Sequence, residues 1–379
     1  MLITNVETFP VWGGHRNFLF VVVDTDEGIS GVGESGLTGR ELAVAGVIEH
    51  FEPLLIGQDP ARIEHLWQTL SRGGFFPAEG AVAAALSAID IALWDIKGQA
   101  LGVPIYDLLG GRVRDRVVCY PHNVGHALEV GPLVESCLAT KEAGWKFVRW
   151  GLPQDGEVLE PAVAVRAAIR QFEAVREAVG DEIEITFDVH TRLDLADALQ
   201  LCRAVEPIRP FFIEDPLRSE NADSFKTLRP RTSVPLAAGE QFTSKWQFRQ
   251  LIEEEWIDYA RIDLCLIGGI SEAKKIAGWC ETHYIKLAVH NPLGPVSSAA
   301  CLQLNLACSN FGVQEQPRKT GEVLTDVVPV QPEWEDGYLL PPTRPGLGIE
   351  FDREAAKAHP FQLVGLPTLR RLDGSFTNW

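Results

Sequence analysis

The chain repeats one pattern eight times between residues 116 and 315. A short apolar run is followed by a longer amphipathic stretch, and a polar or charged residue usually stands last in the run. The eight runs are RVVCYPH, WKFVRW, EIEITFDVH, PFFIED, VPLAAGE, YARIDL, IKLAVH and NFGVQE. Short buried strands that alternate with helices are typical of a (β/α)8 barrel, whose strand carboxyl ends form the active site. The pattern therefore predicts an α/β protein built on a modified, TIM-type barrel.

The first hundred residues follow a different pattern. Residues 18–34, FLFVVVDTDEGISGVGE, alternate like two strands around the turn DTDEG and predict a hairpin. Residues 81–102 carry apolar side chains at three- and four-residue spacing, which predicts a helix that stops at Gly98 or Gly102. Strands followed by helices in this order indicate an α+β capping domain.

These patterns divide the chain into three parts, without a low-complexity linker between them. We expect a capping domain over residues 1–115 and a barrel domain over residues 116–340. The remaining residues, 341–379, are expected to fold back onto the capping domain.

Composition excludes several classes of protein. The content of 46% apolar and 23% charged residues is that of a globular protein, and a formal charge of -18 argues against nucleic-acid binding. Seven scattered cysteines without a Cys-x-x-Cys spacing argue against a disulfide framework or a structural zinc site. The start of the chain lacks the order of a signal peptide, and no 18-residue uncharged apolar run occurs. We expect a cytoplasmic homo-oligomer without a membrane partner.

Three acids stand at the ends of consecutive predicted strands. Asp188, Glu214 and Glu240 follow one another at intervals of 26 residues. Carboxylates that meet at one barrel mouth repel each other unless a cation neutralises them, and ligand sets of oxygen alone favour Mg²⁺, with Mn²⁺ as a substitute. Any one of these acids alone could instead cap the following helix. Their equal spacing favours a metal site.

The next three predicted strands also end in titratable residues: Asp263, His290 and Glu315. An Asp and a His on neighbouring strands can form a hydrogen bond that orients the imidazole, so His290 is a candidate general base. His190 stands two residues after Asp188, and residues at this spacing on a strand share a face. We therefore expect His190 to reach a substrate from the side opposite His290; the alternative is a solvated strand-end histidine.

Together these motifs resemble the enolase superfamily and, within it, the mandelate-racemase-like acid-sugar dehydratases. The segments similar to its capping-domain signatures are GVGES and SAIDIALWDIKGQALGVPIYDLLGG. The segments similar to its barrel motifs, in order, are FDVH, IEDP, AAGE, RIDLCLIGGI and HNPLGP. The likeness is greatest to the galactonate dehydratases, in which a His two residues after the first metal ligand and a His on the seventh strand carry out the chemistry.

The resemblance implies a role for each of these residues. Mg²⁺ on the three acids would bind the carboxylate of a sugar-acid substrate and stabilise an enediolate. His290, oriented by Asp263, would remove the C2 proton of a galactonate-like aldonate, and His190 would protonate the departing C3 hydroxyl. Glu315 would hydrogen-bond the carboxylate oxygen as charge develops. The product would be a 2-keto-3-deoxy acid.

One motif departs from the racemases of this superfamily. Where they place Lys-x-Lys at the end of the second strand, this chain reads KFVRWGLP, with Arg149 and Trp150 in that neighbourhood. An arginine stays protonated and is a poor base, which disfavours an acid-sugar racemase or epimerase. Arg149 could bind a substrate oxygen or form a structural ion pair. The other candidate substrate contacts are Trp150, His122 and His15.

Two further alternatives stay open. Mannonate dehydratases have a tyrosine in the loop after the second strand, and residues 150–161 contain none. A sugar-acid-binding protein without turnover would be expected to have lost a ligand or the His-Asp pair, and neither is lost. Substrate choice would depend on capping loops, here residues 11–17 and 73–77. The candidates for closing the pocket are Trp12, His15, Phe75 and Phe76, and the alternative for each one is ordinary packing.

Overall fold

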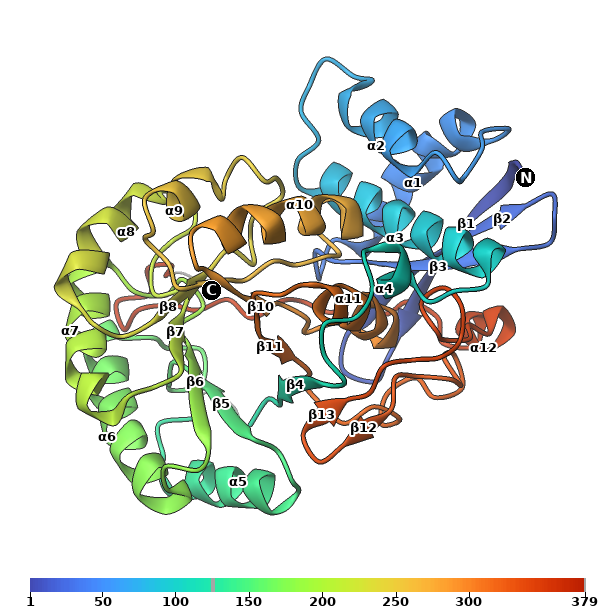
Figure 1. The fold of residues 1–379 in the computed structure, drawn as a ribbon. Helices are drawn as coiled ribbons and strands as arrows, with labels where there is room; N and C mark the ends of the chain where they lie inside the picture. Colours follow the sequence, from blue (N-terminus) through green and yellow to red (C-terminus); the bar gives the residue numbers. More distant parts are fainter. Residues whose placement is uncertain (124–126, 378–379) are drawn as a thin grey trace.

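The structure, a computed structural model, describes residues 1–123 and 127–377. The capping domain contains an antiparallel sheet in the order β1-β2-β3, covered by helices (Figure 1). Its elements are β1 (Ile3–Trp12), β2 (Asn17–Thr25), β3 (Ser30–Ser35), α1 (Glu41–Leu55), α2 (Ile63–Arg72), α3 (Ala81–Leu101) and α4 (Ile105–Leu108). The predicted hairpin is thus β2 and β3, and the predicted helix is α3.

The predicted helix stops at the second of its two candidate glycines. Helix α3 ends at Leu101, so Gly102 follows its last turn, whereas Gly98 lies inside the helix. A Cβ atom on Gly98 would lie 2.6 Å from the Cα atom of Gly346. Gly98 therefore permits a close approach of the C-terminal segment rather than a helix stop.

All eight predicted runs form strands of one barrel (Figure 1). The strands are β4 (Val117–Tyr120), β5 (Phe147–Gly151), β6 (Glu184–Asp188), β7 (Phe212–Glu214), β8 (Leu236–Ala238), β9 (Tyr259–Ala260), β10 (Lys286–Val289) and β11 (Phe311–Glu315). The helices between them are α5 (Gly131–Glu142), α6 (Pro161–Val179), α7 (Leu195–Val205), α8 (Asp223–Leu228), α9 (Arg249–Glu253), α10 (Gly269–Thr282) and α11 (Pro295–Ala307). Strands β5 to β11 pair in parallel in chain order, and β11 pairs with β4. The predicted fold class is confirmed.

Among the described residues, β4 and β5 do not pair as strands, and other contacts close the barrel between them. A hairpin of β12 (Trp334–Glu335) and β13 (Tyr338–Leu339) pairs antiparallel with β4 on the edge away from β11. Beyond the end of β4, the Asn123 N–H donates to the Arg149 carbonyl at 2.9 Å, and Asn123 Oδ1 accepts from the Arg149 N–H at 2.9 Å. The barrel is therefore modified at this seam.

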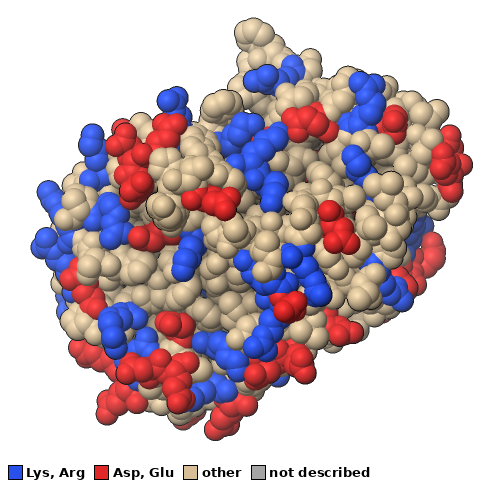
Figure 2. Space-filling model, viewed as in Figure 1, with Lys and Arg blue, Asp and Glu red and all other residues tan. Residues whose placement is uncertain are grey.

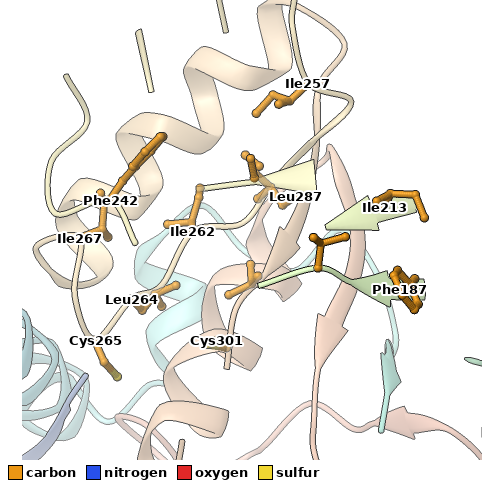
Figure 3. Packing of buried hydrophobic residues seen from close by; sticks show 14 of the residues in the cluster. Phe187, Ile213, Phe242, Ile257, Ile262, Leu264, Cys265, Ile267, Leu287 and Cys301 are labelled. Carbon is orange, nitrogen blue, oxygen red and sulfur yellow. The ribbon is translucent and has the colours of Figure 1, made fainter. Parts of the chain in front are cut away.

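Alternation along the strands separates two kinds of interior. Outward side chains such as Phe187, Ile213 and Leu287 pack in the core between strands and helices (Figure 3). The side chains that fill the barrel below its mouth are Tyr120, Phe147, Phe212, Ala237, Tyr259, Ala288 and Val313. Two residues after most of these comes a polar residue, for example Glu214 after Phe212. The apolar layer thus supports a polar mouth.

Two buried acids of the capping domain bind the first turns of barrel helices. Glu34 accepts hydrogen bonds from the backbone N–H groups of Gly294 and Ser297, at 2.6 and 2.8 Å, where α11 begins. Asp90 accepts from the backbone N–H of Ser271 at 3.0 Å and from its hydroxyl at 2.5 Å, where α10 begins. Burial raises the pKa of Glu34 to about 7 and that of Asp90 to about 7. Helix N-termini favour such acids.

The C-terminal segment contacts both domains. The Trp12 N–H donates to the His359 carbonyl at 3.0 Å, and Arg353, at the start of α12 (Arg353–Lys357), forms an ion pair with Asp24. Further along, the Arg370 N–H donates to the Glu157 carbonyl in the loop after β5. The domain boundaries at residues 115 and 340 stay predictions, and residues 378–379 lie outside the described part of the chain.

Charges of both signs are mixed on the surface (Figure 2), and the cysteines are buried. Lysines and arginines are interspersed with acids on the face drawn in Figure 2, rather than gathered into one basic surface. All seven cysteines are buried and free. Within residues 1–123 and 127–377, no helix combines the length and apolar character needed to cross a bilayer.

The raised pKa of Glu34 predicts a pH dependence of stability. Between its ordinary pKa of 4.5 and its folded value of about 7, the folded state keeps a proton that the unfolded state releases. The free energy of unfolding should therefore fall as pH rises through this window, by up to about 1.4 kcal/mol per unit of pKa shift. Urea unfolding at pH 5, 6 and 7 should show that Glu34→Gln has a shallower fall than the wild type.

The control is Glu49→Gln, because Glu49 is exposed on the same domain. This variant should keep the wild-type slope. Parallel curves for Glu34→Gln and the wild type would show that Glu34 does not titrate in this window.

Candidate active site

The three predicted ligands meet at the barrel mouth. Asp188 ends β6, Glu214 ends β7 and Glu240 follows β8 by two residues. One carboxylate oxygen from each lies within 4.8 Å of the others. Gly239, at φ +124°, turns the chain so that Glu240 faces the mouth, and a Cβ there would lie 2.4 Å from the Phe248 ring. We call these three acids the acid triad.

The acid triad has the properties of a cation site. Glu214 Oε2 and Glu240 Oε2 are buried and have no hydrogen-bond partner among the described residues. Burial raises the pKa of Glu214 well above its ordinary value, and neighbouring carboxylates raise it further, although Arg261 opposes them. Buried carboxylates without partners are costly unless a cation binds them, and an all-oxygen set suits a hard ion such as Mg²⁺. The residues present therefore fit the predicted metal.

Arg261 is a central residue that the sequence analysis missed. Its guanidinium is fully buried, and Nε donates to Glu214 Oε1 at 2.5 Å while Nη2 donates to Glu315 Oε2 at 2.5 Å. Nη1 donates to the Ala288 carbonyl at 2.9 Å. The signal was its position in YARIDL, two residues after the interior Tyr259, which places Arg261 inside the barrel.

The predicted His-Asp pair is present. His290 Nδ1 lies 2.8 Å from Asp263 Oδ2, and Asp263 Oδ1 accepts from the Cys265 N–H at 2.7 Å. His290 Nε2 faces the mouth, 3.5 Å from Glu240 Oε2. Burial lowers the pKa of His290, but Glu315 and Asp263 outweigh burial and raise it above the ordinary value.

His190 lies where we predicted, but for a different reason. Strand β6 ends at Asp188, and His190 has a left-handed backbone at φ +53°, so strand alternation does not place it. A turn does: the His190 N–H donates to Asp188 Oδ1 at 2.7 Å, and Nε2 lies 2.7 Å from Asp188 Oδ2. Burial lowers the pKa of His190, although Asp188 opposes it. The two histidines thus stand at opposite ends of the acid triad, beside Asp188 and Glu240.

Neighbouring residues on β5 have different surroundings. Arg149 points inward and forms a buried ion pair with Asp188, with its Nη2 3.4 Å from His190 Nε2. Trp150 therefore points outward, where it packs against Phe172 at 5.0 Å between ring centroids and is 1% exposed. The prediction that Trp150 contacts substrate is wrong, because adjacent strand residues face opposite sides.

Glu315 lies at the mouth, with its Oε2 4.0 Å from His290 Nε2. Its Oε1 lies 2.5 Å from His122 Nε2, and its Oε2 accepts from Arg261 and from the Asn291 N–H at 3.0 Å. Burial raises the pKa of Glu315, but Arg261 and His290 outweigh burial and hold it well below the ordinary value. Its hydrogen bond to a substrate carboxylate stays a prediction.

Two of the candidate substrate contacts, His122 and His15, line one cavity of about 360 Å³. Burial lowers the pKa of His122 to about 4, and Arg149 adds to the shift. The second capping loop does not reach this cavity. Phe75 and Phe76 are exposed and line a separate cavity of about 730 Å³, and among the described residues Trp12 lines neither. That Phe75, Phe76 and Trp12 help to close the substrate pocket stays a prediction.

Comparison with known families agrees with this geometry. Residues 13–110 match the family described as the mandelate racemase / muconate lactonizing enzyme N-terminal domain. Residues 133–356 match the family described as enolase C-terminal domain-like. The two matches fall on the capping domain and on most of the barrel.

Individual proteins match over nearly the whole chain. A D-mannonate dehydratase of Caulobacter vibrioides is 37% identical, with 96% of each chain covered. A D-galactonate dehydratase of Ralstonia nicotianae is 37% identical, with 100% of each chain covered. Among solved structures, an enolase from Pantoea ananatis with bound D-gluconate and Mg is 33% identical, with a TM-score of 0.94 over 100% of this chain and 99% of that one.

The position of Arg261 predicts a large effect of its removal. Arg261→Met should lower the free energy of unfolding by about 3–5 kcal/mol, because Glu214 and Glu315 would lose their buried partner. Urea denaturation measures this. The matched control is Arg249→Met, whose exposed pair with Glu253 should be worth at most about 1 kcal/mol. Similar losses in the two variants would contradict the role assigned to Arg261.

Proposed function

Since the chain belongs to the mandelate racemase / muconate lactonizing enzyme family of the enolase superfamily, we propose that it is a magnesium-dependent dehydratase of a sugar acid. The observation that carries the proposal is the pair of histidines at opposite ends of the acid triad. Removal of a proton and of a hydroxyl from adjacent carbons needs one base and one acid around a bound carboxylate. The relatives named D-galactonate and D-mannonate dehydratase support the same reaction class.

The acid triad would hold the metal. Bound Mg²⁺ would supply positive charge to the substrate carboxylate and to the enediolate oxygens that form when the C2 proton leaves. The chain's own contribution is to fix the three carboxylates. Arg261 holds Glu214, and Arg149 holds Asp188, so two of the three ligands are oriented by buried guanidinium groups.

His290 would remove the C2 proton. Its Nδ1 is held by Asp263, so its Nε2 is directed at the mouth and is free to accept a proton. His190 would give a proton to the departing C3 hydroxyl. The two imidazoles stand beside Glu240 and Asp188, at opposite ends of the acid triad, so one can take the C2 proton while the other gives a proton at C3.

The same arrangement disfavours racemisation. A racemase needs a second base on the other face of C2, and Arg149 stands at the end of the second strand, β5, where a lysine would be required. Its guanidinium is paired with Asp188 and stays protonated. We therefore propose elimination of water to a 2-keto-3-deoxy acid. A galactonate-like configuration is the first choice of substrate and a mannonate-like one the second.

The direct test is a panel of sugar acids with Mg²⁺, with 2-keto acids detected by semicarbazide. We expect turnover of at least one galactonate-configured acid. Turnover of a mannonate-configured acid alone would favour the second choice, and inversion at C2 without water loss would favour an epimerase. Binding of a sugar acid without any product would indicate a non-catalytic protein.

Metal removal gives the next prediction. EDTA should abolish turnover, and added Mg²⁺ should restore it. Glu214→Gln should weaken metal binding, because it removes one charge from the ligand set at nearly constant shape. Titration calorimetry with Mg²⁺ measures the affinity, and Glu253→Gln, on the exposed helix α9, is the control. Full activity in metal-free buffer would exclude the metal role.

The roles of the two histidines can be separated in deuterium oxide. His290→Asn should lose both dehydration and exchange of the C2 proton, because the base is gone. His190→Asn should make little 2-keto acid but keep exchange, and a C3-fluoro substrate should partly restore its elimination, since fluoride needs less protonation. NMR follows exchange and product together. Near-normal dehydration of the hydroxy acid by His190→Asn would show that His190 is not the acid.

A further inference from the structure

The cavity beside His122 extends the proposed site outward. Its walls come from segments far apart in the chain, and besides His122 the residues that matter here are His15 and Arg16 between β1 and β2, Pro292 after β10, and Arg318 after β11. His122 links it to the reacting groups. His122 Nε2 contacts Glu315 Oε1, and Glu315 Oε2 lies 4.0 Å from His290 Nε2. The cavity therefore borders the residues that surround His290.

The cavity is cationic in a protein whose formal charge is -18. Arg16, Arg318 and Lys319 line it, and among the described lining residues there is no Asp or Glu. Within residues 1–123 and 127–377, neither Arg16 nor Arg318 lies within ion-pair distance of a carboxylate. The side chain of Arg16 donates to the Pro292 carbonyl at 2.7 Å. Lys319 lies over the Trp334 ring, 4.2 Å from its centroid.

Arg16 and Arg318 line the same cavity, so their like charges oppose each other. Burial lowers the pKa of Arg16, Glu315 and Glu34 oppose the shift, and Arg318 lowers it again. Arg318 also lowers the pKa of His15, after burial. Like charges gathered in a partly buried cavity are costly unless a counter-charge binds between them. Grouped carboxylates favour a bound cation at the acid triad, and grouped guanidinium groups favour a bound anion here.

We propose that this cavity binds a second carboxylate at the far end of the substrate, so that the preferred substrates are sugar diacids rather than sugar monoacids. The inference rests on the proposed function, since it places C1 at the acid triad and the terminal carboxylate between Arg16 and Arg318. Guanidinium groups suit this ligand because their planar N–H donors match the two oxygens of a carboxylate. It refines the expectation of a galactonate-like acid, because galactarate has the same hydroxyl configuration with a carboxylate at C6.

Matched acids provide the test. The kcat/KM values of galactarate and galactonate, and of glucarate and gluconate, are measured with Mg²⁺. We expect each diacid to exceed its monoacid by roughly 10- to 100-fold, the range for a charge-assisted hydrogen bond or two. Arg318→Gln should lower this diacid-to-monoacid ratio by roughly tenfold, and Arg16→Lys should lower it less, since a charge remains.

The control is Arg344→Gln, which removes an exposed arginine outside the cavity and should keep the wild-type ratio. Equal kcat/KM values for monoacids and diacids would overturn the diacid inference but not the proposed dehydratase function. The same holds if Arg318→Gln lowers kcat/KM equally for both kinds of acid. If neither these four acids nor any other acid in the panel lost water, the proposed function itself would be overturned.

Discussion

The acid-rich mouth of the barrel depends on one buried guanidinium, that of Arg261. Its hydrogen bonds join Glu214 of the acid triad to Glu315 at the opposite side of the mouth. A fully buried arginine is costly by itself and is stable here only because two carboxylates and a carbonyl satisfy it. The same strand end also supplies Asp263, two residues later, which orients His290. One strand therefore sets both the electrostatic balance and the direction of the base.

The capping domain stabilises that strand end and the next one. Asp90 binds the first turn of α10, the helix after β9, and Glu34 binds the first turn of α11, the helix after β10. These are the two strands whose ends provide Asp263 and His290. Docking of the capping domain thus fixes the helices that follow both members of the pair, and the raised pKa values of the two capping acids record how deeply the interface is buried.

The sequence predicted those features that follow from strand order. Eight apolar runs gave the barrel, and polar residues at or near the end of a run gave Asp188, Glu214 and the His-Asp pair, because strand ends meet at one mouth. Features that depend on which way a side chain points along a strand, or on the turn after it, were missed. Trp150 was assigned to the site although alternation turns it outward, and Arg261 was overlooked inside an apolar run. The turn that places His190 has no strand pattern to reveal it.

The proposed elimination of water, rather than racemisation, depends on what Arg149 contacts. Arg149 neutralises Asp188, so the second strand provides charge balance instead of a second base. In the proposed mechanism, His290 takes the C2 proton and His190 donates a proton at the neighbouring carbon. The acid triad carries negative charge, and the cavity beside His122 carries the positive charges of Arg16 and Arg318. A substrate with a carboxylate to place at each end would be held in one direction, with C2 facing His290.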